Sequence, residues 1–216
     1  LMAAGRANGV GGAGGGLPGD QRAWRQGHRQ PMSRVTGALV ERRVIAACAA
    51  AALYRRRAWT DVGGFDPRFF CYVEDVDLGF RLCLRGHECW YVPDAVAEHV
   101  GSASAGVGSA FAVYHGHRNL VWTFVKNMPR ALLVRYLAGH LAVNLAGLVW
   151  FAARGRGVAY LAAKRDALQG LPSAWRARRA IQQARTAPTD DIRALLNRES
   201  LLGRVRERRA LRSQDL

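Results

Sequence analysis

The chain has 216 residues, which is enough for one ordinary domain and an appendage. Its 32 Lys and Arg against 16 Asp and Glu give a formal charge of +16, so we expect an anionic partner: nucleic acid, anionic lipid or a phosphorylated substrate. The four cysteines form no Cys-x-x-Cys pair and lie among apolar neighbours. This pattern argues against a zinc site or a disulfide framework and indicates the buried thiols of an intracellular protein.

Residues 1–34 differ in composition from the rest of the chain. Eight of the first 19 residues are glycine, and no hydrophobic periodicity follows them. Such a segment buries too little apolar surface to offset its ordering entropy, so we predict that it is disordered. A second interpretation is that residues 1–34 are a spurious extension of the chain. It has no charged-then-apolar pattern, so we predict no export signal.

Regular structure is expected from residue 35 onward. The run of small apolar residues at 44–54 predicts a strand buried on both faces. Residues 55–62 predict a short helix that ends at two glycines, which readily adopt the positive φ of a helix end. Leucines at helical spacing predict a second helix over 74–85. Strands are then expected at 89–92 and 95–100, separated by proline.

From Gly108 onward the pattern is helical, with a first helix that must end before Pro129 because proline cannot continue it. Residues 131–153 form the most apolar long window. Three interpretations stay open for this window: a membrane-spanning helix, an interfacial helix and a buried core helix. Amphipathic helices follow, broken at 170–172 and at 187–188.

The C-terminal region is strongly basic. Between Arg154 and Arg212 there are 15 Lys and Arg against 5 Asp and Glu. Each such cation near an anionic leaflet contributes about 1 kcal/mol, so we predict that an anionic membrane surface is a partner. Positive charge beside an apolar segment marks the cytoplasmic side, which predicts a peripheral or single-span protein at the cytoplasmic face of a membrane. We expect no nucleic-acid partner, because no zinc-finger spacing, RNA-recognition signature or aromatic interleaving accompanies the arginines.

Three carboxylates, Glu74, Asp75 and Asp77, fall within four residues at the start of the 74–85 helix. Helix N-termini favour negative charge by about 0.3–1 kcal/mol each, so interaction with the helix dipole is the simplest role for them. Asp77 can also pair with Arg81 at i,i+4. The alternatives are that these side chains hold protons or a metal. A calcium loop is not expected, because apolar residues occupy the positions of later ligands.

His99 opens a loop of small residues, 24 positions after Asp75. Two roles are open for it: a hydrogen-bonded histidine at a strand end, or a metal ligand. Arg118 and Asn119 form a polar pair on a predicted helix. For this pair, too, there are two alternatives, a brace for the loop before residue 74 or contact with a substrate phosphate.

Several segments recur in the order and spacing of one known family. They are Gly-Gly-Phe-Asp at 63–66, Phe-Phe at 69–70, Glu-Asp-Val-Asp-Leu-Gly-Phe-Arg-Leu at 74–82, Tyr-Val-Pro-Asp-Ala at 91–95, His-Val-Gly-Ser at 99–102, Arg-Asn at 118–119 and Lys-Asn-Met-Pro at 126–129. Together they resemble the acceptor-side half of a family 2 glycosyltransferase of the bacterial rhamnosyltransferase-like branch.

The resemblance implies an α/β fold, a partial GT-A (Rossmann-like) domain at 35–129 that lacks most nucleotide-binding strands. Helical, membrane-associated, basic sequence at 130–216 would follow it. The family binds a nucleotide-diphosphate sugar donor and a divalent metal, Mg²⁺ or Mn²⁺, and transfers the sugar with inversion in one displacement. The implied acceptor is a lipid-linked or cell-surface glycan.

The resemblance also assigns roles to residues. Asp75 is the general base that deprotonates the acceptor hydroxyl, with Glu74 beside it, because a sugar hydroxyl is a poor nucleophile until its proton is being removed. His99 would complete the metal shell. The remaining expected residues would bind substrate: Asp77, Phe70, Trp90 and Arg118.

The sequence departs from the family before Val44, where we find no Asp-x-Asp and no strand–helix alternation. We therefore expect the C-terminal half of such an enzyme, inactive by itself. One alternative is a non-catalytic, membrane-associated remnant. Another is a metal-dependent hydrolase built on the three carboxylates and His99.

Overall fold

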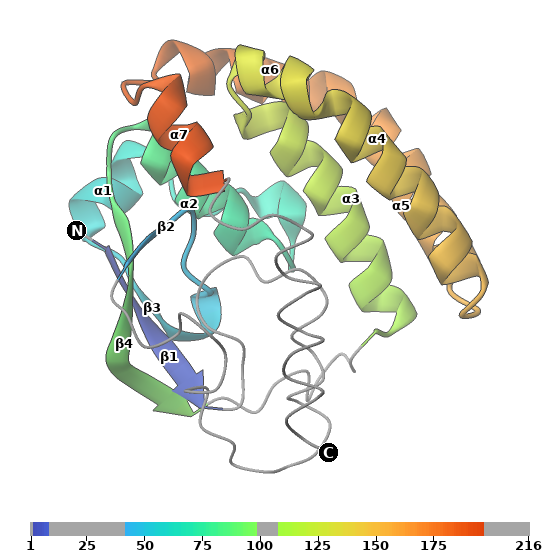
Figure 1. Ribbon diagram of the computed structural model, residues 1–216, viewed down its shortest axis with the longest axis horizontal. Coiled ribbons are helices and arrows are strands. Elements are labelled where there is room, and N and C mark those ends of the chain that lie inside the picture. Colours follow the sequence, from blue (N-terminus) through green and yellow to red (C-terminus); the bar gives the residue numbers. More distant parts are fainter. Residues whose placement is uncertain (1, 9–41, 99–107, 197–216) are drawn as a thin grey trace.

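The structure is a computed structural model that describes residues 2–8, 42–98 and 108–196. A four-stranded mixed sheet lies on one side, the long helices lie on the other, and α2 (Glu74–Leu84) runs between them (Figure 1). The sheet has the order β2–β4–β1–β3, in which β4 is parallel to β1 and the other pairings are antiparallel. Its strands are β1 (Met2–Asn8), β2 (Arg42–Val44), β3 (Ala52–Leu53) and β4 (Cys89–Glu98).

The helices begin and end close to the predicted positions, because local signals set their ends. The Ser109 side chain accepts a hydrogen bond from Ala112 N at 3.1 Å and caps α3 (Ala110–Asn127). That helix ends before Pro129, as proline requires. Besides α2, the helices are α1 (Arg56–Asp61), α3 (Ala110–Asn127), α4 (Arg130–Ala152), α5 (Gly157–Gln169), α6 (Leu171–Gln183) and α7 (Thr189–Leu196).

The strands differ from the prediction, because distant partners decide them. Residues 44–54 are not one strand: β2 ends at Val44, and a 3₁₀ turn, η3 (Ala49–Ala51), precedes β3. The two strands expected around Pro93 are a single strand, β4. The register of β4 against β1 shifts between Ala4 and Arg6, opposite the segment that contains Pro93, which has no N–H to donate.

The predicted disorder of residues 1–34 is wrong for Met2–Asn8. These residues form β1, which lies between β4 and β3 and makes backbone pairs with both. Pairing on both edges supplies ladder hydrogen bonds that composition alone does not reveal. The rest of the glycine-rich segment lies outside the described residues.

The core is centred on α2, whose residues 77–84 are all buried. Leu78, Leu82 and Leu84 have no exposed surface and pack with Cys89 and Tyr91 of β4. Of the four cysteines, all free thiols, Cys83 and Cys89 are buried as predicted, whereas Cys48 and Cys71 are half-buried.

Helix α2 approaches the chain after β2 very closely at Gly79. A Cβ placed on Gly79 would lie 2.5 Å from both Cα and Cβ of Ala46. No real side chain fits at that distance, so this contact needs glycine on one side and a small residue on the other.

The long helices form a second layer around α3. Trp122 of α3 donates from Nε1 to Ala167 O of α5 at 3.0 Å. Arg178 of α6 is buried and donates to the carbonyls of Val125 and Met128. These bonds satisfy carbonyls that the end of α3 would otherwise leave unpaired.

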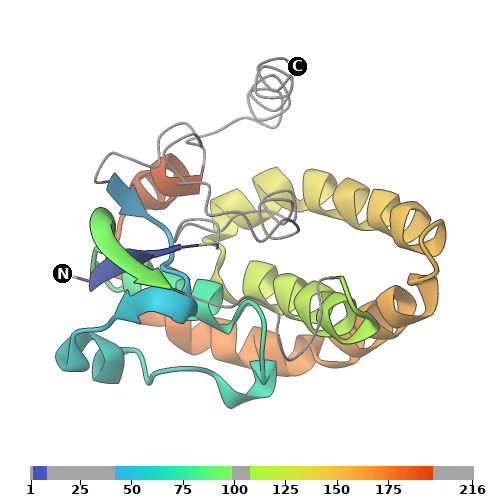
Figure 2. The same ribbon diagram turned by 90° about the horizontal axis from the view of Figure 1, so that it is seen from below.

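Helix α4 is long and apolar enough to cross a membrane, with a mean hydropathy of 1.5 over its most apolar window. Only 6% of that window is buried, so the core-helix alternative for residues 131–153 is wrong. Figure 2 shows α4 and α5 as a hairpin that extends away from the sheet.

We predict that Gly79→Ala destabilises the fold by about 1–3 kcal/mol, because α2 must move away from Ala46. The matched control is Gly139→Ala in α4, where nothing lies within 4 Å of the new Cβ. The control should be neutral or stabilise by about 0.5–1 kcal/mol through helix propensity. Urea unfolding measures both, and equal effects would contradict the close packing of α2.

Candidate active site

The candidate base, Asp75, lies in the first turn of α2 and is half-buried. Its Oδ2 accepts from Ala49 N at 3.1 Å, and its Oδ1 accepts from Val76 N at 2.8 Å. Burial raises the pKa of Asp75, and these backbone bonds oppose that shift. A carboxylate fixed by two N–H groups still has free lone pairs, so it can accept a proton from a bound hydroxyl.

Glu74 and Tyr54 place two unsatisfied polar atoms beside Asp75. Glu74 Oε2 and the Tyr54 hydroxyl are buried and have no hydrogen-bond partner among the described residues. Burial is the main cause that raises the pKa of each, and the negative charge of Asp75 adds to both shifts. Buried polar groups are nearly always hydrogen-bonded in folded proteins. Two buried polar atoms without a partner, next to the Asp75 carboxylate, are therefore typical of a ligand site.

The loop that leads into α2 has a strained backbone. Phe70, Tyr72 and Val73 have φ values of 63°, 64° and 69°, although none is glycine. Left-handed backbone at non-glycine residues costs of order 1–3 kcal/mol each and concentrates at functional sites. The surrounding structure must therefore hold this loop in place.

Asn119 of α3 provides that hold. It is fully buried, and its Nδ2 donates to the carbonyls of Phe69, Cys71 and Tyr72 at 2.8–2.9 Å. Arg118 donates to Phe69 O at 3.1 Å and to Arg68 O at 3.2 Å. Of the two alternatives for the Arg118–Asn119 pair, the structure shows the loop brace. Arg118 thus takes part in the brace, and its expected contact with substrate stays a prediction.

Asp77 also differs from its expected substrate-binding role, because it has no exposed surface. Its carboxylate accepts from Arg81 Nε at 2.9 Å and from Lys126 Nζ at 2.8 Å. Asn127 Nδ2 donates to Oδ1 at 2.8 Å. The predicted i,i+4 pair with Arg81 is present, and Asp77 is structural.

The two adjacent phenylalanines have different environments. Phe69 is 1% exposed and packs against Trp122 and Lys126 of α3. Phe70 is 74% exposed, so it remains a candidate for substrate contact.

Trp90 is not brought to this site. Its neighbours in β4, Cys89 and Tyr91, face the core, and alternation along a strand places Trp90 on the other face of the sheet. There its Nε1 donates to Glu88 Oε2 at 3.1 Å.

A metal site cannot be built from the described residues. Among them no three His, Cys, Asp or Glu side chains gather as a ligand set. The carboxylate of Asp77 is occupied by cations and Asn127, and His99, the predicted ligand, lies outside the described residues. The described residues therefore do not supply a ligand set for a metal by themselves.

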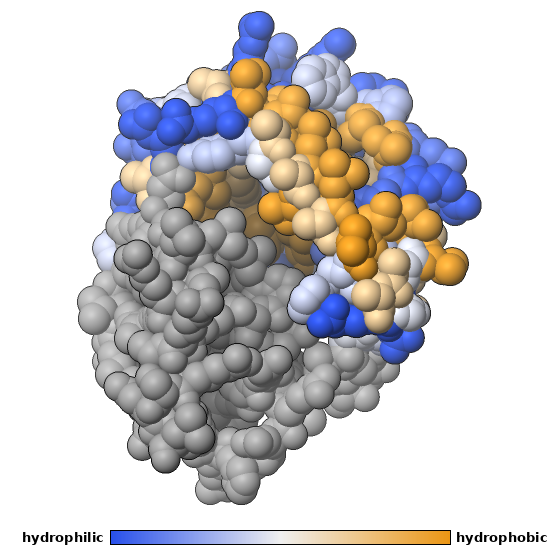
Figure 3. All heavy atoms as spheres, turned by 45° about the vertical axis from the view of Figure 1, so that its right-hand side comes forward, coloured by the Kyte–Doolittle hydropathy of each residue, from blue (hydrophilic) through white to orange (hydrophobic). Residues whose placement is uncertain are grey.

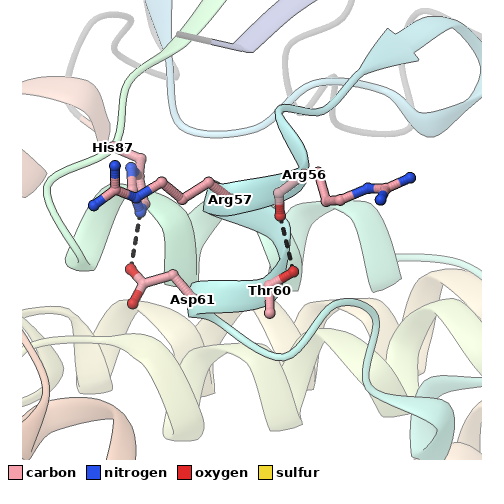
Figure 4. A pocket seen from close by; sticks show the side chains of 5 residues that line it. All are labelled: Arg56, Arg57, Thr60, Asp61 and His87. Carbon is pink, nitrogen blue, oxygen red and sulfur yellow. Dashed lines mark hydrogen bonds and ion pairs between the residues drawn. The ribbon is translucent and has the colours of Figure 1, made fainter.

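A separate hollow of about 790 Å³ lies on the far side of α1 (Figure 4). Its lining includes Asp61, whose carboxylate holds Arg85 at 2.8 Å and His87 at 2.9 Å. The hydrogen bonds from Arg85 and then His87 lower the pKa of Asp61 to about 2. Because this carboxylate is already paired, the hollow is a less suitable site than the unpaired groups around Asp75. The remaining lining residues are Arg56, Arg57 and Thr60.

Sequence reasoning proposed the brace role of Asn119 but missed Tyr54 and Lys126, although for Lys126 a signal was present in the spacing along α3. Asn119, Lys126 and Asn127 are seven and eight positions apart, so they share one helix face. That face holds both the strained loop and Asp77. The sheet, the helix that presents Glu74 and Asp75, and the braced loop together define an α/β protein with a carboxylate site.

Comparison with known proteins agrees with this arrangement. The model of the family described as "Glycosyltransferase like family 2" matches residues 22–131, which is 110 of the 216 residues. The chain therefore belongs to this glycosyltransferase family, and the predicted family is confirmed. The match begins at residue 22, inside the segment 1–34 that we had set apart.

Two curated relatives, from two strains of Mycobacterium tuberculosis, are each named N-acetylglucosaminyl-diphospho-decaprenol L-rhamnosyltransferase. Each is 40% identical to this chain over 95 residues, which is 43% of this chain. The matched part spans only 28% of the length of each relative. The similarity to rhamnosyltransferases agrees with the branch that the motifs indicated.

We predict that Glu74→Gln stabilises the fold at neutral pH. A raised pKa in the folded state means that wild-type stability falls as pH rises above the unfolded value of about 4.3. The glutamine variant does not have this loss, so its advantage should grow between pH 4 and pH 8. Urea unfolding across that range measures the advantage.

The control is Asp61→Asn, for which the sign is opposite. A lowered pKa contributes stability above the unfolded value, about 3.9, and this contribution is lost as pH falls towards 2. The control should therefore be less stable than wild type at pH 7 and equal to it near pH 2. A Glu74→Gln advantage that shrinks with rising pH would contradict the buried, unpaired carboxylate.

Proposed function

We propose that the chain is the acceptor-side part of an inverting glycosyltransferase that moves a sugar from a nucleotide diphosphate to a lipid-linked glycan. The observation that supports this most strongly is the half-buried Glu74–Asp75 pair with its unsatisfied neighbours at the end of a strained, braced loop. The family supports sugar transfer, and the names of the two relatives support an acceptor carried on a polyprenyl diphosphate.

In the proposed reaction Asp75 is the general base. The acceptor hydroxyl oxygen forms a new bond to the anomeric carbon, while the bond from that carbon to the diphosphate oxygen breaks. The leaving nucleotide diphosphate takes the electron pair, and Asp75 takes the hydroxyl proton. Its raised pKa brings this carboxylate closer to the operating pH, which improves it as a base.

Glu74 has a different role in this proposal. Its free Oε2 accepts a hydrogen bond from a second hydroxyl of the acceptor and so orients the sugar. A divalent metal, Mg²⁺ or Mn²⁺, is part of the proposal only for residues beyond those described, with His99 as a candidate ligand. The donor site and the whole enzyme's substrates are likewise proposals, because the match spans 28% of the relatives.

We predict that Asp75→Asn lowers kcat by about 10²–10⁴-fold and leaves acceptor binding within a few-fold of wild type. Transfer of radiolabelled sugar is measured for this chain and for the same chain extended by any in-frame sequence before it. Asp190→Asn, an exposed carboxylate on α7, is the matched control and should keep full turnover.

Three outcomes would contradict the proposal. Near-normal turnover of Asp75→Asn excludes this carboxylate as the base. A larger loss in Glu74→Gln than in Asp75→Asn assigns the base to Glu74 instead. A complete absence of transfer by the extended wild-type protein favours the alternative, a non-catalytic membrane-associated remnant.

The proposed membrane partner rests on the outward face of α4. On its inner side, His140 of α4 stacks on Phe124 with 4.0 Å between ring centroids, and the backbone carbonyl of Asn144 accepts from the Tyr160 hydroxyl at 2.7 Å. Figure 3 shows an apolar band on the opposite face with hydrophilic side chains at both ends. The exposed apolar side chains of α4 are Val134, Leu137, Leu141, Val143, Leu145, Val149 and Trp150.

We propose that α4 lies in the plane of the cytoplasmic membrane surface and does not cross the bilayer. Its 23 residues would span about 34 Å, enough to cross. However, α4 packs against α5, which carries Lys164 and Arg165, and crossing would take these charges into hydrocarbon. An in-plane helix keeps them in water and places Arg135 and Arg154 near lipid phosphates.

We predict that the chain floats with vesicles containing anionic lipid and that the double variant Leu145→Glu/Val149→Glu binds them at least about tenfold more weakly. The matched control is Leu53→Glu on β3, which is 76% exposed but distant from α4. Alkaline carbonate should release the wild-type protein from vesicles. Retention in carbonate indicates a spanning helix, and equal binding of both variants contradicts any role of this face.

A further inference from the structure

Four aromatic side chains form a cluster beside the Glu74–Asp75 pair. Phe111 is at its centre, 4.5 Å from His115, 6.2 Å from Tyr72 and 6.4 Å from Phe70 between ring centroids. Phe70 also lies 5.5 Å from His115. Two of these residues come from the strained loop and two from the first turns of α3, so the cluster joins elements that are distant in sequence.

The backbone at Phe70 explains why its ring is at the surface. Phe70 has φ 63° and ψ −69°, and Cys71 N donates to Phe69 O at 2.9 Å across it. This is the positive-φ γ-turn, which is rare and strained. The turn directs Phe69 into the core at 1% exposure and Phe70 outward at 74%.

An exposed phenylalanine in a strained turn does not stabilise this fold. Strain of order 1–3 kcal/mol persists where function needs the geometry, and exposed apolar patches mark interaction sites. Phe111 is also 43% exposed, so the two rings present a shared apolar surface. Tyr72 is half-buried and packs on the edge of Phe111.

The cluster adjoins the candidate catalytic pair. Tyr72 lies two residues before Glu74. Burial is the main cause that raises the pKa of Tyr72 and of Cys71, and the charge of Glu74 adds to both shifts. His115 has its pKa lowered by burial and then by Arg118, so it is neutral at pH 7 and can pack against an uncharged ligand. A ligand over the rings would therefore reach the carboxylates with its polar edge.

A pyranose ring has the matching chemistry. Its C–H groups form an apolar face that packs on aromatic rings, and its hydroxyls project from the rim towards polar groups. We propose that Phe70, Tyr72, Phe111 and His115 form an aromatic platform that binds the sugar ring of the acceptor and presents its hydroxyl to Asp75. This inference rests on the proposed function and names the part of the acceptor that this surface recognises.

The test measures binding, so it does not depend on turnover. The probe is the ethyl ester of N-acetylglucosaminyl diphosphate, and the comparison ligand is ethyl diphosphate without a sugar. Saturation-transfer difference NMR on the full chain should show the strongest transfer at the C–H protons of the sugar ring. Phe70→Ala should raise the Kd of the probe by about five- to tenfold, and Phe70→Trp should stay within about twofold of wild type.

Two more variants separate the ring from the backbone and from general effects. Phe70→Gly removes the ring and also relieves the positive φ, and it should lose as much affinity as Phe70→Ala. Trp175→Ala on α6 removes a 47% exposed aromatic side chain elsewhere and should bind the probe as wild type does. Circular dichroism confirms that each variant keeps the wild-type fold.

The platform is wrong if Phe70→Ala keeps wild-type affinity, or if ethyl diphosphate binds as tightly as the full probe. These outcomes differ from a failure of the proposed function. If the extended protein transfers sugar but Phe70→Ala leaves the KM for the acceptor unchanged, only the platform is excluded. If no transfer occurs but the platform binds the sugar with the expected pattern, the platform is supported and the catalytic role of Asp75 is contradicted.

Discussion

The arrangement of the site depends on one buried set of ion pairs. Asp77 of α2 binds Arg81 and Lys126, and Lys126 Nζ also donates to Asp66 at 2.7 Å. Arg81 in turn donates to the carbonyls of Val62 and Gly64 at 2.6 Å. Two carboxylates thus join α2, α3 and the turn after α1 through Arg81 and Lys126, and Asp66 also pairs with the more exposed Arg68. Removal of one partner would leave an unpaired buried charge, at a cost of about 3–5 kcal/mol, so the three elements are held in one relative position.

Helix α3 transmits that position to the strained loop. Lys126 and Asn127 hold Asp77, and Asn119, two turns earlier and about 10 Å away along the axis, holds the carbonyls before α2. The segment from Phe69 to Asp77 is therefore fixed at both ends by one rigid helix. This explains how three left-handed, non-glycine residues persist directly before Glu74 and Asp75. The strain is offset by hydrogen bonds that only this relative position allows.

Much of the helical structure could be predicted from sequence, because its signals are local. The glycines at 63–64, Ser109 and Pro129 mark helix ends within two residues. The strands could not be predicted in this way. The alanine-rich sequence at 46–52 has little β-propensity, and the partners of β4 lie far away in the chain. The same difference explains the site. Spacing located the three carboxylates at the start of α2, and i,i+4 geometry predicted the Asp77–Arg81 pair. The substrate-binding role expected for Asp77 does not fit its burial, and no sequence signal gave the side of the sheet on which Trp90 lies.

The small residues of this chain serve the same geometry as its charges. Gly79 lets α2 lie against Ala46, and that contact places Ala49 N where it can bind Asp75. On the other side, Phe124 of α3 stacks on His140 of α4, so the helix that braces the site also supports the apolar outward face of α4. Under the proposed function, a sugar on a lipid diphosphate would bring its lipid to a membrane and its sugar to Asp75. Helix α3 lies between the apolar face of α4 and Asp75, so a packed helix fixes the distance between them. A fixed distance would let the sugar headgroup of the proposed acceptor reach the carboxylate while its lipid chain stays in the bilayer.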